Sequence, residues 1–339
     1  MRLYEDRLNL LSKLTLQRAM NGAGIWSSYH ASRITGSPAI SGLPMSMSIE
    51  PTTSCNLRCP ECPSGLRSFT RPTGMLSEEV FRHVMDELGG KLSYLTFYFQ
   101  GEPYLHPKFT EMVAYASAKG IYTATSTNAH FLTEENARKT IESGLDRLII
   151  SIDGTTQDTY QAYRVGGSLE KVLEGTRTIL RLRKEMKSVT PHIVFQFLVV
   201  KPNEHQIPHV QELARKLGVD RVALKTAQIY DFQSGSPLIP DQDAYSRYRK
   251  NDDGTYAIKN ALSNQCWKMW HSCVITWDGK VVPCCFDKDA HHVMGDVKTS
   301  TFREIWLSDQ YNAFRSTLLR SRSDIDMCRN CTEGTKVWA

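Results

Sequence analysis

Long apolar runs are missing from this sequence, and so is a strong excess of either charge. No stretch approaches the ~20 consecutive apolar residues of a membrane-spanning helix, and Met1 to Asp6 lack the basic-then-apolar layout of a signal peptide. The 41 Lys and Arg residues nearly balance the 36 Asp and Glu residues, which leaves a net charge of +5. We therefore expect a cytoplasmic protein with no membrane span and no nucleic-acid partner.

A disulfide framework is also not expected, because the nine cysteines are odd in number and a reducing compartment disfavours such bonds. The cysteines instead group at 55/59/62, 266/273/284/285 and 328/331, which predicts metal binding at two places. The first group has C-x3-C-x2-C spacing and is one thiolate short of a fully ligated zinc or iron–sulfur site. A metal centre with an open position indicates chemistry rather than a structural role.

Strands and helices are expected to alternate between residues 45 and 226. The loops after the carboxyl ends of such strands build the functional site, and the Cys55–Cys62 loop follows the first of them. The repeated units predict an α/β fold with a parallel sheet, either doubly wound or closed into part of a barrel. The expected strands are 45–52, Tyr94–Phe99, Tyr122–Ser126, Arg147–Ile152, His192–Val199 and Arg221–Lys225.

The other segments lack this alternation. Residues 1–44 predict an N-terminal helical extension, and the turn-forming residues of 227–261 predict a linker. Residues 262–339 contain a hairpin with an Asp278-Gly279 turn, a helix over Phe302–Leu319 and all six remaining cysteines. We therefore expect a small cysteine-rich α+β domain at the C-terminal end.

The cysteine loop after the first strand resembles the signature of the radical S-adenosylmethionine (SAM) superfamily. In that family three cysteines hold a [4Fe-4S] cluster, and SAM chelates the fourth iron through its amino and carboxylate groups. The resemblance implies that Cys55, Cys59 and Cys62 are cluster ligands. It also implies a partial (β/α)6 TIM-like barrel over residues 45–226.

Later strand ends resemble the SAM-binding segments of the same family. Gln100-Gly101-Glu102-Pro103 resembles the Gly-Gly-Glu-Pro motif near the methionyl amino group, with Gln100 in place of the first glycine. Arg164 matches an arginine that pairs with the SAM carboxylate, which a guanidinium fork fits well. Leu198 and Val199 lie where relatives contact adenine. The cofactor-binding residues implied by the resemblance are Gly101, Glu102, Asn128, Ser151, Asp153, Arg164 and Val199.

The second cysteine set resembles the SPASM domain of this family, or its shorter Twitch form, which carries auxiliary iron–sulfur clusters. The resemblance implies one auxiliary [4Fe-4S] cluster, with Cys285 as the alternative to Cys284 because adjacent side chains on a strand point to opposite faces. Cys273 is expected to pack as a small apolar residue. The implied ligands are Cys266, Cys284, Cys328 and Cys331.

The resemblance implies an enzyme that cleaves SAM reductively to a 5′-deoxyadenosyl radical, which abstracts hydrogen from a substrate C–H. A one-electron donor such as flavodoxin or ferredoxin supplies the electron. By the same resemblance, the expected substrate is a peptide undergoing modification or, alternatively, a sugar-like aminocyclitol that is oxidised. A non-enzymatic metal-binding scaffold is the alternative from another class. No histidine spacing picks out a catalytic acid or base.

Overall fold

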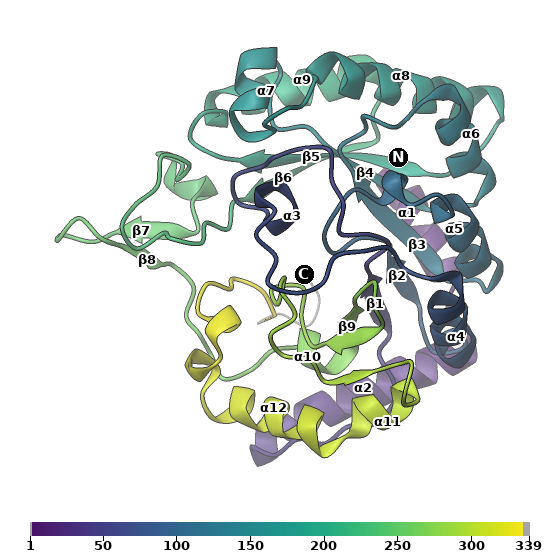
Figure 1. Cartoon of the computed structure of the whole chain (residues 1–339), viewed down its shortest axis with the longest axis vertical. Coiled ribbons are helices and arrows are strands. Elements are labelled where there is room, and N and C mark those ends of the chain that lie inside the picture. The colour runs from purple at the N-terminus through teal and green to yellow at the C-terminus, as the bar shows by residue number, and fades with distance from the viewer. Residues whose placement is uncertain (1, 335–339) are drawn as a thin grey trace.

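The described part of the chain is built on one curved sheet. This computed structural model describes residues 2–334. The predicted segments 1–44 and 262–339 therefore extend beyond the described residues at residue 1 and at residues 335–339. Six strands run parallel in chain order along the sheet, which Figure 1 shows as an arc around the centre of the molecule. They are β1 (Ser46–Ile49), β2 (Tyr94–Thr96), β3 (Tyr122–Thr127), β4 (Arg147–Ser151), β5 (His192–Val199) and β6 (Arg221–Thr226).

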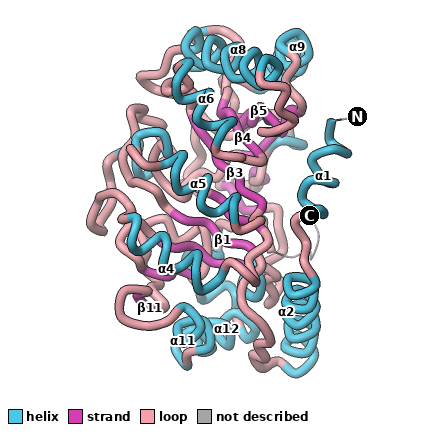
Figure 2. The backbone as a smooth tube through the Cα atoms, turned by 90° about the vertical axis from the view of Figure 1, so that its right-hand side faces the viewer, coloured by secondary structure: helices cyan, strands magenta, loops and turns pink. Residues whose placement is uncertain are grey.

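Helices cover the outer face of this arc, so the inner face is left for the site. In Figure 2 several of these helices lie in front of the strands. Three begin where the sequence offers a hydroxyl cap, with Ser77, Thr133 and Ser168 each accepting a hydrogen bond from an N–H of the first turn. The outer helices are α4 (Glu78–Leu88), α5 (Phe109–Ala118), α6 (Glu134–Glu142), α8 (Leu169–Glu185) and α9 (Ile207–Leu217). This confirms the α/β fold expected as a partial barrel.

The C-terminal hairpin joins the same sheet, a feature that the sequence pattern did not predict. Strand β9 (Ser272–Ile275) pairs in parallel with β1, and β10 (Lys280–Val282) pairs antiparallel with β9. A short strand, β11 (Gly295–Asp296), ends the sheet at this edge. The second cysteine group is therefore joined to the barrel through continuous backbone hydrogen bonds.

The two N-terminal helices pack against both parts. Helix α1 is Arg2–Ser12 and α2 is Leu16–Thr35. The buried Arg18 guanidinium of α2 donates to the carbonyls of Gly89, Lys119 and Gly120 at the ends of α4 and α5. Further along α2, the ring of Tyr29 lies 5.2 Å from Trp267 and 5.3 Å from Trp270. Helix α2 thus ties the barrel to the C-terminal part.

The remaining elements are short. The predicted helix over Phe302–Leu319 is two helices, because Ser308 leaves the helical conformation and caps the second one. The linker contains a hairpin that was not predicted. None of the helices within residues 2–334 is long and apolar enough to cross a membrane. These elements are α3 (Pro63–Leu66), α7 (Gln157–Tyr163), β7 (Tyr248–Lys250), β8 (Tyr256–Ile258), α10 (Lys268–His271), α11 (Phe302–Leu307) and α12 (Asp309–Arg320).

Candidate active site

The loop after β1 places its three cysteines on one cavity. Cys55, Cys59 and Cys62 all line a cavity of about 490 Å³ at the carboxyl ends of the strands. The loop is fixed by the backbone N–H of Arg58, which donates to the carbonyl of Val165 at 2.9 Å, and by the buried side chain of Leu57. The thiols are therefore held on the inner face, where the sequence places the open metal centre.

The chemistry of these thiols suits a cluster better than a single ion. Within residues 2–334 no three His, Cys, Asp or Glu side chains converge closely enough to hold one metal ion. An iron–sulfur cluster instead takes one thiolate on each iron, which spreads the sulfur atoms apart. Burial raises the pKa of the Cys55 thiol to about 11, so metal binding must displace protons from this loop. The three residues fit the [4Fe-4S] cluster that the family resemblance implies.

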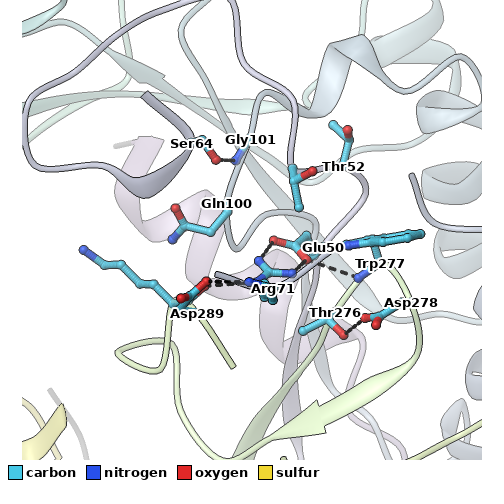
Figure 3. Close-up of polar contacts among 12 residues, drawn as sticks. Glu50, Thr52, Ser64, Arg71, Gln100, Gly101, Thr276, Trp277, Asp278 and Asp289 are labelled. Atoms are coloured by element: carbon cyan, nitrogen blue, oxygen red, sulfur yellow. Dashed lines mark hydrogen bonds and ion pairs between the residues drawn. The ribbon is translucent and has the colours of Figure 1, made fainter. Parts of the chain in front are cut away.

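Gly101, after β2, lies against the cysteine loop. Its φ of +76° is in the left-handed region, and a Cβ at this position would lie 2.1 Å from the carbonyl oxygen of Thr52. Its N–H donates to Ser64 Oγ at 2.9 Å, as Figure 3 shows, and the N–H of Glu102 donates to the carbonyl of Ser54 at 2.8 Å. Only glycine allows this close approach.

The carboxylate of Glu102 lies between β2 and β3 and is almost fully buried. It accepts hydrogen bonds from Thr127 Oγ1 at 2.7 Å and from the backbone N–H of Asn128 at 2.8 Å. Burial raises the pKa of Glu102 to about 7, although these donors favour the ionised form. Both Glu102 and Asn128 line the cavity. The site thus holds a carboxylate that titrates near neutral pH.

Asp153, just after β4, and Arg164, at the end of α7, form a largely buried ion pair. Arg164 Nε donates to Asp153 Oδ2 at 2.5 Å, and Asp153 Oδ1 accepts from the backbone N–H of Leu198 at 2.7 Å. Arg164 lines the cavity together with Ser151, whereas Asp153 is fully buried behind them. The geometry makes Asp153 a positioning residue for Arg164 rather than a group that faces the cofactor.

Val199 points away from the cavity that its neighbour lines. It has no exposed surface and packs in the main core, whereas Leu198 lies on the cavity wall. Side chains of adjacent strand residues face opposite sides of a sheet, so only one of the two reaches the site. The structure therefore favours Leu198 over Val199 for an apolar cofactor contact.

The second cysteine group is enclosed. Cys266, Cys284 and Cys328 pack in an apolar cluster with Trp267 and Trp270, and all three thiols are buried. Cys331 is also buried and accepts a hydrogen bond from Arg322 Nη2 at 3.3 Å. These four residues are the ones that the sequence selected.

The two remaining cysteines lie elsewhere. Cys285 is exposed and lines the active-site cavity, where its thiol lies beside that of Cys284 but outside the apolar cluster of Cys266, Cys284 and Cys328. Cys273 packs in the core of the main sheet. This arrangement favours Cys284 over Cys285 as the auxiliary ligand.

Several cavity residues had no signal in the sequence. Lys268 and Lys288 come from the C-terminal part, and Gln196 comes from β5. Lys268 pairs with Glu333 at 3.5 Å, whereas the amino group of Lys288 lies 4.7 Å from the ring centre of Tyr230. A lone lysine after Cys284 matches no motif, so only the folded chain reveals that it faces the cysteine loop.

A buried ion pair fastens the segment after the cysteine loop to the C-terminal part (Figure 3). Arg71 donates two hydrogen bonds to Glu50, at 2.8 and 2.6 Å, and Glu50 also accepts from the backbone N–H of Trp277 at 3.2 Å. Arg71 Nε reaches the carbonyl of Lys288 at 3.3 Å, and its neighbour Thr70 donates its N–H to Asp289 at 3.0 Å. These contacts fix the position of Lys288 at the cavity.

Comparison with known proteins agrees with this arrangement. Residues 49–214 match the Radical SAM superfamily, and residues 266–332 match the iron–sulfur cluster-binding domain called SPASM. The first match contains the open cysteine loop and the second contains all four enclosed cysteines.

Individual relatives match over most of the chain. PqqA peptide cyclase of Gluconobacter oxydans is 27% identical over 321 residues, which cover 87% of this chain and 84% of the relative. The tungsten-containing aldehyde ferredoxin oxidoreductase cofactor-modifying protein of Pyrococcus furiosus is 26% identical over 310 residues, covering 79% of this chain and 82% of that protein. Streptococcus suis SuiB bound to precursor peptide SuiA shares the fold, with a TM-score of 0.63 at 12% identity over 86% of this chain and 70% of SuiB. Because both domain matches fall where the structure places a cysteine group, this chain belongs to the radical SAM superfamily, as an enzyme that binds a [4Fe-4S] cluster and SAM and carries an auxiliary iron–sulfur domain.

Proposed function

We propose that this enzyme modifies a peptide by abstracting hydrogen from one of its C–H bonds. The observation that carries the proposal is a single cavity in which the open cysteine loop faces residues of both the barrel and the C-terminal part. Two of the similar proteins are named for peptides, one as PqqA peptide cyclase and the other in complex with precursor peptide SuiA. Their likeness supports a peptide substrate.

Different residues of the cavity bind the cluster and SAM in this proposal. Cys55, Cys59 and Cys62 hold the cluster, which when bound supplies the electron that cleaves SAM reductively. Glu102 offers its carboxylate to the methionyl ammonium, and Arg164, oriented by Asp153, offers its guanidinium to the carboxylate. The remaining predicted contacts are polar ones from Asn128 and Ser151 and an apolar one from Leu198, which replaces Val199.

A second cavity offers a route for the substrate. It has a volume of about 560 Å³ and lies between the cysteine loop, the linker and the C-terminal part. It shares Gln228, Phe286 and Lys288 with the first cavity, so the two spaces meet at these side chains. A peptide segment lying in the outer cavity would present one residue to the inner one. We assign the outer cavity to substrate binding.

The enclosed cysteines hold one auxiliary [4Fe-4S] cluster in this proposal. Cys266, Cys284, Cys328 and Cys331 supply four thiolates, which leaves no position open for SAM. A closed cluster beside the cavity is suited to accept the electron that remains on the substrate after hydrogen abstraction. We further propose a flavodoxin or ferredoxin as the donor to the first cluster, and a cytoplasmic location. The proposed domain boundaries remain 1–44, 45–226, 227–261 and 262–339.

The test uses the full chain, purified without oxygen and reconstituted with iron and sulfide. Reductant and SAM should yield 5′-deoxyadenosine, and a short peptide encoded beside the gene should change mass in the same reaction. The Cys55→Ala variant is the control, because it removes one thiolate of the open loop. No 5′-deoxyadenosine from the reconstituted protein would refute the reaction class. Oxidation of an aminocyclitol while the peptide stays unchanged would refute the peptide assignment alone.

A further inference from the structure

Each sulfur of the open cysteine loop faces a different polar side chain. Arg164 Nη1 lies 3.7 Å from Cys59 Sγ, and Asn128 Nδ2 lies 4.0 Å from Cys55 Sγ. The side-chain amide of Gln100 contacts Cys62, with 3.7 Å between Oε1 and Sγ. The three partners follow three different strands, β2, β3 and β4, so they do not come from one local turn.

Two of these side chains are fixed by a second contact. Arg164 is held by Asp153, and the Asn128 amide nitrogen also donates to Asn56 Oδ1 at 2.8 Å. An amide nitrogen carries two hydrogens, so Asn128 has a second one to direct at Cys55. Gln100 and Asn128 are both more than nine-tenths buried. In such surroundings a hydrogen bond is stronger than it is in water.

Gln100 contacts Cys62 in the form that a protonated thiol requires, with the S–H donating to the amide oxygen. A cluster-bound cysteine is a thiolate and has no hydrogen to donate. Rotating the amide by about half a turn exchanges its oxygen and nitrogen and directs an N–H at the sulfur. The glycine that occupies this place in the family motif has no side chain to do so. Gln100 therefore gives this chain a sulfur contact that the motif itself does not supply.

We propose that Arg164, Gln100 and Asn128 donate hydrogen bonds to the thiolates of Cys59, Cys62 and Cys55 and raise the reduction potential of the cluster. Reduction adds negative charge to the cluster, and hydrogen bonds to its sulfurs stabilise that charge. The proposal rests on the assignment of these cysteines as cluster ligands. It gives Arg164 and Asn128 a role toward the cluster in addition to any contact with SAM.

The test is a redox titration of the reconstituted full chain followed by electron paramagnetic resonance, without SAM. The signal of this cluster is identified as the one that changes shape when SAM is added afterwards. Gln100→Leu should lower the equilibrium constant for one-electron reduction about tenfold, a shift of about 59 mV. Asn128→Leu should shift it less, because its contact with sulfur is longer. Gln196→Leu is the matched control, since this glutamine lines the same cavity without a sulfur contact and its loss should leave the potential unchanged.

Gln100→Glu guards against a variant that folds badly, because it keeps the size of the side chain and removes both N–H donors. It too should lower the potential. If Gln100→Leu and Gln100→Glu bind the wild-type amount of iron and both keep the wild-type potential, the hydrogen-bond proposal is wrong while the ligand assignment stands. If the wild-type protein takes up no cluster in the open loop, both are wrong.

Discussion

Each of the two cysteine groups has an arginine beside it, but only the first group opens onto a cavity. Arg164 lies beside Cys59 in the first group, and Arg322 lies beside Cys331 in the second. The first group opens onto a cavity of about 490 Å³, whereas the second is enclosed in an apolar cluster that includes Trp270. Access, rather than charge, therefore separates a site that admits a co-substrate from one that does not.

Burial affects the thiols of both groups in the same direction. It raises the pKa of Cys55 to about 11 and that of Cys328 to about 12, so both of these thiols are protonated at neutral pH until metal binds. Iron must compete with protons in both places. The difference lies in ligand number, since three thiolates leave an open iron and four do not.

The largest effect is expected when the open group is removed. Replacing Cys55, Cys59 and Cys62 with Ala should abolish formation of 5′-deoxyadenosine and remove about half of the ~8 irons expected for two four-iron clusters. Iron analysis and chromatography of the reaction products measure the two quantities. Cys273→Ala is the control, because this buried cysteine belongs to neither group and its loss should spare both. Normal SAM cleavage by the triple variant would show that the open group does not hold the cluster that cleaves SAM.

Removal of the enclosed group should separate SAM cleavage from modification of the peptide. Cys328→Ala with Cys331→Ala should remove the other half of the iron but leave SAM cleavage without substrate largely intact, because the open loop keeps its ligands. Iron content, 5′-deoxyadenosine and modified peptide are measured on the same sample. Cys285→Ala should keep the full iron content, since Cys285 lies outside the apolar cluster that contains Cys266, Cys284 and Cys328. A loss of iron from Cys285→Ala but not from Cys284→Ala would make Cys285 the ligand.

The two cysteine groups could be predicted from the sequence because each contains cysteines at a recognisable spacing. The C-x3-C-x2-C loop and the final C-x2-C pair are local patterns, and the fifth expected strand, His192–Val199, has the bounds found in the structure. Gly101 was singled out by its motif, and its backbone angle and close contact with Thr52 give the physical reason. Features that depend on neighbours in the chain were therefore predicted well.

Features that depend on distant contacts were not predicted. The parallel pairing of β9 with β1 joins residues more than two hundred positions apart, and no local pattern encodes it. The choice between Leu198 and Val199 depends on which face of β5 lines the cavity. Because β5 has apolar residues on both faces, the sequence pattern does not identify that face. Lys288 reaches the site in a turn that is held there by contacts from Arg71 and Thr70, which are distant in sequence.

The ion pair between Glu50 and Arg71, which joins the barrel to the C-terminal part, gives a prediction about stability. Arg71→Leu should lower the free energy of unfolding by about 3–5 kcal/mol, because it leaves the fully buried Glu50 carboxylate without its partner. Urea unfolding of the reconstituted protein measures the change. Arg82→Leu is the matched control, since its pair with Glu78 is exposed and should contribute much less to stability. Equal effects of the two substitutions would show that the Glu50–Arg71 pair does not hold the regions together.

The smallest expected effect is a pH dependence confined to the open group. The pKa of Glu102 is raised to about 7, so its carboxylate becomes protonated as pH falls through that value and no longer attracts the methionyl ammonium. The dissociation constant for SAM should therefore rise several-fold between pH 8 and pH 6, as measured by calorimetry on the reconstituted enzyme. Glu102→Gln should bind SAM more weakly at pH 8 and lose this dependence. A wild-type affinity that stays constant over this range would mean that Glu102 only braces Thr127 and Asn128, and that the open group owes its SAM binding to Arg164 and the cluster.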